Sequence, residues 1–127
     1  MTIDRAVVAT AISWLGLWVH EIHRVRGLLG LTPDGDLFML PIAAALALWW
    51  MRTRSASTAL GLVVYSAVNL IGGWLTEMPL GWLPFAPEQT MAHYAVYVVY
   101  AVSQLPLLTL AGTRVWNLGR VKSATRD

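Results

Sequence analysis

Residues 6–26, AVVATAISWLGLWVHEIHRVR, join a long apolar run to a short span that carries two histidines, a glutamate and two arginines. A helix that begins near Arg5 reaches His23 and Arg24 after about 20 residues, the length that crosses a hydrocarbon core of about 30 Å. The length of the run and the single basic residue close before it favour an uncleaved helix over a signal peptide. The stretch therefore predicts a membrane-spanning helix over 5–24 with ionisable groups at its far end.

The composition also points to lipid as the surroundings of the chain. Of its 127 residues, 57% are hydrophobic and 13% are charged, whereas soluble domains have about 45–50% apolar and about 25% charged residues. A chain of this length has a large surface to keep hydrated in water, so the excess of apolar residues does not fit a small soluble core. We expect one domain in contact with the lipid bilayer.

Three further spans are predicted, over 33–51, 56–76 and 87–113, followed by a basic cytoplasmic tail over 114–127. The second and the fourth span have similar start signals, because Pro33 and Pro87 suit a first helical position and acidic residues follow each of them. The fold class is thus all-α, an integral membrane bundle of four transmembrane helices in up-and-down order.

The basic residues predict the orientation of this bundle. Four spans place both termini on one side of the membrane, together with Arg5, Arg52, Arg54, Arg114, Arg120, Lys122 and Arg126. Only Arg24 and Arg26 fall on the other side. Because cytoplasmic loops carry the excess of Lys and Arg, we expect a multi-pass protein of the plasma (inner) membrane with both termini in the cytoplasm.

Several functional classes are excluded or disfavoured. The chain has no cysteine, which excludes disulfides, thiolate metal sites and thiol redox chemistry. The net charge of +2 comes without a basic stripe interleaved with aromatics, so we expect no nucleic-acid partner. The sequence contains no evident nucleophile–base–orienter set and no Gly-rich phosphate loop, and we expect a protein that is not an enzyme.

Polar side chains follow helical spacing on three of the predicted spans. Polar groups that face hydrocarbon are costly, so these stripes should turn toward the interior of the bundle. We expect an outward-opening polar pocket between the first, third and fourth spans. Its candidate residues are His20, Glu21, His23, Arg24, Asn69, His93, Tyr97, Tyr100 and Gln104. The alternative is that the same groups only hold the helices together by hydrogen bonds.

The three histidines raise two cofactor hypotheses. His20 and His23 share one helix face and His93 could add a third metal ligand, but the two arginines beside the pair repel a cation. Arg24 also stands where a zinc-protease motif needs its second histidine, and we predict no metal site. His93 with His20 or His23 could instead hold a b-type haem between helices, although we expect no cofactor.

Three functions remain open from the sequence. The first is a non-enzymatic membrane subunit that assembles with itself or with a larger membrane complex, since four short helices leave much apolar surface to other helices. The second is a small-molecule or ion binder or transporter that uses the outer polar pocket. The third is a bis-His haem electron carrier.

Overall fold

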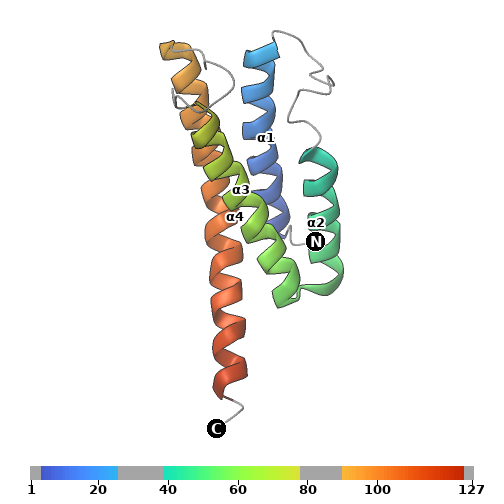
Figure 1. Ribbon diagram of the computed structural model, residues 1–127. Coiled ribbons are helices and arrows are strands. Elements are labelled where there is room, and N and C mark those ends of the chain that lie inside the picture. Colours follow the sequence, from blue (N-terminus) through green and yellow to red (C-terminus); the bar gives the residue numbers. More distant parts are fainter. Residues whose placement is uncertain (1–3, 26–38, 78–89, 125–127) are drawn as a thin grey trace.

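The computed structural model describes residues 4–25, 39–77 and 90–124, which form four helices and no strand. The helices are α1 (Arg5–Val25), α2 (Met39–Thr53), α3 (Ala56–Glu77) and α4 (Met91–Ala124). Figure 1 shows that successive helices run in opposite directions, so that both ends of the chain lie at the same end of the bundle. The all-helical bundle expected from the sequence is confirmed.

Helices α1 and α3 cover the stretches 5–24 and 56–76 in which the first and third spans are predicted. The expected start of the second helix at Pro33 lies outside the described residues, and α2 is described from Met39. The fourth helix begins at Met91 rather than near Pro87, because the Thr90 hydroxyl accepts a hydrogen bond from the backbone N–H of His93 (3.2 Å) and so caps the helix.

The segment expected to form a basic tail is helical through residue 124. Helix α4 has 34 residues, and Figure 1 shows its C-terminal part extending beyond the other helices. Within this part the Arg120 guanidinium lies over the Trp116 ring, 5.3 Å from its centroid, which joins residues one turn apart on the same face. Pro106 lies inside the helix without ending it.

The turn between α2 and α3 is short and polar, since only Arg54 and Ser55 separate the two helices. Arg54 adopts a positive φ of 46°, and its N–H donates to the carbonyl of Trp50 (2.9 Å), which closes the end of α2. Ser55 then caps α3 by accepting a hydrogen bond from the N–H of Thr58 (3.3 Å).

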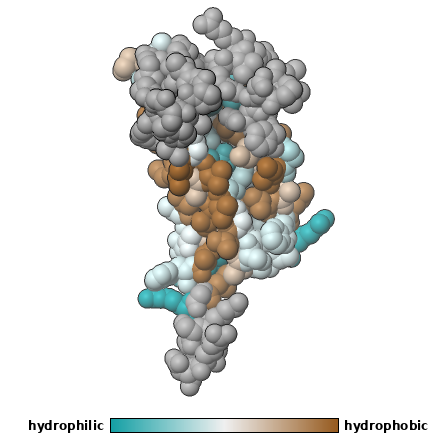
Figure 2. Space-filling view, in the orientation of Figure 1, coloured by the Kyte–Doolittle hydropathy of each residue, from teal (hydrophilic) through white to brown (hydrophobic). Residues whose placement is uncertain are grey.

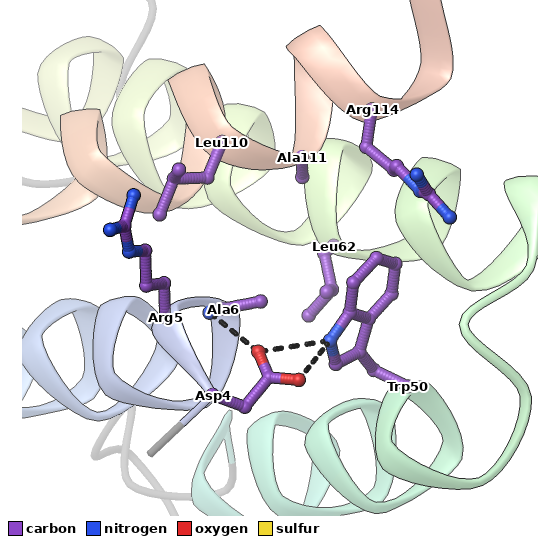
Figure 3. A pocket seen from close by; sticks show the side chains of 8 residues that line it. All are labelled: Asp4, Arg5, Ala6, Trp50, Leu62, Leu110, Ala111 and Arg114. Carbon is purple, nitrogen blue, oxygen red and sulfur yellow. Dashed lines mark hydrogen bonds between the residues drawn. The ribbon is translucent and has the colours of Figure 1, made fainter. Parts of the chain in front are cut away.

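The bundle core has two parts. The end near the termini is filled by small and aliphatic side chains of all four helices together with two aromatic ones, namely Ala6, Ala9, Ala43, Trp50, Ala59, Leu62, Tyr65, Leu107 and Ala111. Trp50 also ties α2 to the start of α1, because its indole N–H donates to both Asp4 oxygens (3.2 and 3.3 Å; Figure 3). Toward the other end, the described residues Leu17, Tyr97 and Tyr100 form a smaller cluster with Trp14 and Met39 packed against it, and buried polar groups become more frequent.

The outward faces of the helices are apolar. On α1 they carry Val8, Ile12, Leu15 and Val19, and on α3 they carry Leu60, Val64, Val68 and Ile71. These residues repeat at helical spacing, on the side opposite to the buried polar residues. Figure 2 shows such apolar residues along the middle of the visible face and hydrophilic ones projecting near the end that holds the termini. A soluble helix has the opposite arrangement, with its apolar stripe turned inward.

Within residues 4–25, 39–77 and 90–124, two helices are long and apolar enough to cross a membrane. The segments are Ala56–Gly73 of α3 and Met91–Leu118 of α4. Helix α2 is apolar but shorter in its described part. Helix α1 has 21 residues and includes Arg5, His20, Glu21 and Arg24.

Candidate functional site

The polar half of the bundle is built where α4 packs between α1 and α3. Of the nine candidate residues, the structure buries His20, Glu21, Asn69, His93, Tyr97, Tyr100 and Gln104. The side chains of His23 and Arg24 lie outside the described part of the molecule. Stripes from three helices therefore converge on one interior region, because α1 and α3 both have their main contacts with α4.

One layer of this region joins α1 to α4. The Ser13 hydroxyl donates to the Gln104 side-chain oxygen, and the Gln104 amide donates to the Ser13 carbonyl (3.1 Å) and to the Ser103 hydroxyl (3.1 Å). Gly16 makes this close approach possible, since a Cβ there would lie 2.5 Å from the Cβ of Ser103. Gln104 thus acts as an interhelical hydrogen-bonding residue with its own polar groups satisfied.

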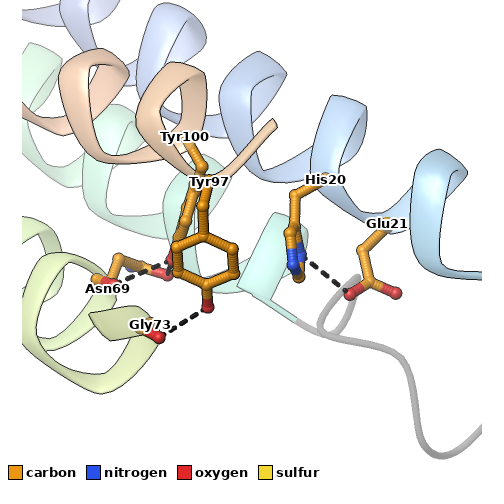
Figure 4. A network of polar contacts seen from close by, with 6 residues as sticks. All are labelled: His20, Glu21, Asn69, Gly73, Tyr97 and Tyr100. Carbon is orange, nitrogen blue, oxygen red and sulfur yellow. Dashed lines mark hydrogen bonds and ion pairs between the residues drawn. The ribbon is translucent and has the colours of Figure 1, made fainter. Parts of the chain in front are cut away.

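A second layer joins α3 to α4. The Tyr100 hydroxyl donates to the carbonyl and the side-chain oxygen of Asn69 (3.0 and 2.9 Å), and the Tyr97 hydroxyl donates to the carbonyl of Gly73 (2.6 Å; Figure 4). The Asn69 amide donates back to the Tyr65 carbonyl (2.8 Å). A Cβ at Gly73 would lie 2.6 Å from the Tyr100 ring, so glycine is required for the contact.

His20 and Glu21 lie beyond these layers, near the C-terminal end of α1. Their side chains are almost completely buried, with 3% and 1% of their residue surfaces exposed, and the His20 Nδ1 is 3.6 Å from a Glu21 carboxylate oxygen (Figure 4). This distance suits an ion pair but is too long for a hydrogen bond. Among the described residues, neither ring nitrogen of His20 makes a hydrogen bond. A buried imidazole without hydrogen bonds is costly and calls for a functional explanation.

Aromatic rings of α4 surround the His20 imidazole. Its centroid lies 4.9 Å from that of Tyr97, which stands edge-on, and 5.6 Å from that of Tyr100, which is stacked at 25°. The buried His93 ring is 6.3 Å from His20 and 5.5 Å from Tyr97. The His20 imidazole is therefore enclosed by aromatic rings of α4 on one side and by the Glu21 carboxylate on the other.

The two cofactor hypotheses find no support in this geometry. Within the described residues no three His, Asp or Glu side chains are grouped as metal ligands would be. His20 and His93 do come together from different helices, as a haem would require, but the Tyr97 ring is within 5.5 Å of both imidazoles. A porphyrin held between the imidazoles would have to extend into the space that Tyr97 fills.

Sequence reasoning did not single out the polar link at the opposite end of the bundle. There Asp4 caps α1 through the N–H of Ala6 (2.9 Å), accepts from Trp50 and pairs with Arg54 (2.8 Å). The sequence does contain a sign of this link, because Asp4 is an acidic residue at the end of the bundle where several arginines are expected. Trp50 is the buried hydrogen-bond donor of this link.

Comparisons with known proteins add no family assignment to this geometry. A scan against protein-family models, a search of curated proteins and a search of solved structures each found no match.

Proposed function

We propose that this chain is a multi-pass protein of the plasma membrane, with both termini in the cytoplasm, that binds a proton in the polar half of its bundle. The observation that carries the proposal is the His20–Glu21 pair, two ionisable side chains buried inside a bundle whose outer surface is apolar. Ionisable groups inside a membrane are expensive to maintain and mark ion or proton sites.

The inverted distribution of side chains supports the location in a membrane. Only 33% of the candidate span in α3 and 28% of that in α4 are buried, whereas a core helix of a soluble bundle is mostly buried. The remaining surface of these spans is rich in exposed Val, Leu and Ile. Such a continuous apolar surface is unfavourable in water and matches contact with lipid tails.

The charges support the orientation. Arg5 starts α1, Arg52 and Arg54 close α2, and Arg114 and Arg120 lie in the C-terminal part of α4, so all five belong to the end of the bundle that holds the termini. Because basic residues are in excess on the cytoplasmic side of membrane proteins, this distribution supports a cytoplasmic location for this end of the bundle. The His20–Glu21 pair lies toward the outer end.

A proton suits the packing around this pair better than a larger solute. His20 and Glu21 are closed off from solvent, so a solute would need the helices to separate, whereas a proton needs only groups that exchange it. Among the described residues, the titratable groups that face His20 are Glu21 on α1 and His93, Tyr97 and Tyr100 on α4. On helix α3 the neutral Asn69 does not face His20 directly but accepts a hydrogen bond from the hydroxyl of Tyr100.

Infrared difference spectroscopy tests this proposal on the purified chain in lipid nanodiscs. Between about pH 8 and about pH 5, the range in which an imidazole changes charge, we expect the band of a protonated carboxyl group to grow. The band should disappear in Glu21→Gln and remain in Asp4→Asn, whose carboxylate is held at the other end by Arg54. In His20→Phe, which keeps an aromatic ring between the tyrosines, the midpoint of this band should shift, because the substitution removes the polar ring that lies 3.6 Å from the Glu21 carboxylate.

Two results would contradict proton binding at this pair. One is a spectrum without any pH-dependent carboxyl band assigned to Glu21. The other is a band whose midpoint is the same in His20→Phe as in the unchanged chain, since Glu21 would then titrate without sensing the imidazole.

A second candidate, a subunit that assembles with other membrane helices, is favoured by the surface of α2. Helix α2 packs less extensively against α1 and α3 than each of those helices packs against α4, and it exposes Leu40, Ile42, Leu48, Trp49 and Met51. An apolar cavity of about 190 Å³ lies between α1 and α2, with Ala44 and Ala47 on its wall. Small residues allow a further helix to approach closely.

The two candidates respond to different substitutions. Assembly predicts a particle larger than one chain in mild detergent, which Ala44→Trp should dissociate by filling the cavity between α1 and α2, whereas His20→Phe should leave it intact. Light scattering coupled to size-exclusion chromatography measures the mass of the protein in each particle without the mass of the bound detergent. A monomer that keeps its stability on dilution would exclude assembly with itself.

A further inference from the structure

A second feature of the molecule lies at the end that holds the termini, far from the His20–Glu21 pair. There a cavity of about 160 Å³ opens between the start of α1, the end of α2 and the middle of α3 and α4 (Figure 3). Its lining is Asp4, Arg5, Ala6, Trp50, Leu62, Leu110, Ala111 and Arg114. The cavity thus combines apolar walls with charged residues.

The only carboxylate of this lining is already engaged. Asp4 accepts hydrogen bonds from the Ala6 N–H (2.9 Å) and from the Trp50 indole (3.2 and 3.3 Å), and its second oxygen is 2.8 Å from an Arg54 guanidinium nitrogen. Its negative charge is therefore balanced by Arg54, which does not line the cavity.

In the part of the chain that the structure describes, the two arginines of the lining have no such partner. Arg5 and Arg114 are exposed, and within the described residues neither forms an ion pair. Figure 3 shows them on opposite sides of the cavity, with Leu110 and Ala111 between them. With Asp4 neutralised by Arg54, the cavity carries an excess of two positive charges at its margin.

We propose that this cavity binds the headgroup of an anionic phospholipid of the cytoplasmic leaflet, with its phosphate at Arg5 or Arg114. Guanidinium groups match phosphate oxygens in shape and charge. The apolar walls from Leu62, Leu110 and Ala111 suit the glycerol ester and first methylenes of a lipid, which a free phosphate lacks. The inference rests on the proposed membrane location and is independent of proton binding at His20 and Glu21.

Native mass spectrometry of the detergent-solubilised full chain tests the inference by counting bound lipids. The probes are dioleoyl phosphatidylglycerol and, as the neutral comparison, dioleoyl phosphatidylcholine. We expect tighter binding of the first phosphatidylglycerol, and a loss of about fivefold in its affinity for Arg5→Gln or Arg114→Gln, since one basic residue near anionic lipid contributes about that factor.

The matched control is Arg52→Gln, which removes the same charge at the same end of the bundle from a residue that does not line the cavity. It should leave the affinity for the first phosphatidylglycerol within about twofold. Circular dichroism of each variant checks that the helices are intact, so that a loss of binding is not a loss of fold.

Three outcomes would overturn the inference. Equal losses for Arg52→Gln and Arg114→Gln would show general attraction by the basic end instead of a site. Equal affinity for the two lipids would show that the headgroup charge is not recognised. Displacement of phosphatidylglycerol by inorganic phosphate, at an ionic strength matched with chloride, would assign the cavity to a soluble phosphate. None of these results would affect the pH-dependent carboxyl band expected for Glu21.

Discussion

The contact between α1 and α4 at Gly16 gives the sharpest test of the packing. In Gly16→Ala the new methyl group would lie 1.9 Å from the Ser103 Oγ and 2.5 Å from the Ser103 Cβ. The hydroxyl could rotate away only by breaking its hydrogen bond to the Tyr100 carbonyl (2.6 Å), and the Cβ is fixed to the backbone. Because carbon atoms pack at about 3.5–4.0 Å, the two helices must separate by about 1 Å.

The size of the effect follows from two opposing terms. Overpacking a close helix–helix contact lowers the free energy of unfolding by about 1–3 kcal/mol. Replacing glycine by alanine inside a helix raises it by up to about 1 kcal/mol, because alanine has the higher helix propensity. Gly112→Ala is the matched control, because a Cβ there meets nothing within 4 Å and α4 gains helix propensity alone. We therefore expect Gly16→Ala to be less stable than Gly112→Ala by about 1–3 kcal/mol.

Reversible unfolding in mixed micelles, followed by circular dichroism, measures this difference. Combining Gly16→Ala with Ser103→Gly removes the clashing Cβ, so the two substitutions should show a favourable coupling energy of about 1–3 kcal/mol in a double-mutant cycle. Equal stability of Gly16→Ala and Gly112→Ala, or a coupling energy near zero, would refute the described contact between α1 and α4.

Two further changes test the polar links at the two ends of the bundle. Tyr100→Phe removes the hydroxyl that joins α4 to Asn69 and should lower the free energy of unfolding by about 0.6–2 kcal/mol, the range for interhelical hydrogen bonds in membranes; no change would mean that this bond is not formed. Asp4→Asn keeps an acceptor for the Trp50 indole but loses the ion pair with the exposed Arg54. Thermal unfolding should show a loss of stability below about 1 kcal/mol, and added salt should abolish the difference from the unchanged chain. Asp4→Ala also removes the helix cap and should cost about 1–2 kcal/mol more.

The inward direction of the polar stripes could be predicted from the sequence, because their spacing and the cost of polar groups in hydrocarbon leave few alternatives. His20, Asn69, His93 and Gln104 were placed in the interior on this ground, and the structure buries all four. Whether they form a ligand pocket stays a prediction, since burial alone does not distinguish a binding site from hydrogen bonds between helices.

The pairing of these groups could not be predicted. Tyr100 reaches Asn69 and Tyr97 reaches the Gly73 carbonyl because α3 and α4 have a particular rotation and vertical offset, which depend on close contacts such as that of Gly73 with the Tyr100 ring. Helical spacing within one segment carries no information on these offsets.

The ends of helix α4 differ from those of the predicted fourth span, 87–113, for two separate physical reasons. Pro87-Glu88 and Thr90 are both helix-start signals, and the sequence does not rank them, whereas the structure caps the helix with Thr90. At the C-terminal end, the sequence-based prediction ended the fourth span at residue 113, where the apolar residues give way to basic ones. The thickness of a bilayer limits the apolar part of a helix but not the helix itself, and α4 continues to Ala124.

The central claim, that the bundle crosses a membrane with the termini inside, is tested most directly by labelling single cysteines in intact cells. The chain is free of cysteine, so Ser57→Cys at the start of α3, Met91→Cys at the start of α4 and Val102→Cys on the outward face of α4 each give one reactive site. A membrane-impermeant maleimide should label Met91→Cys in intact cells, Ser57→Cys only after permeabilisation, and Val102→Cys in neither case. Labelling of Ser57→Cys and Met91→Cys from the same side, or recovery of the chain in the soluble fraction, would contradict the account.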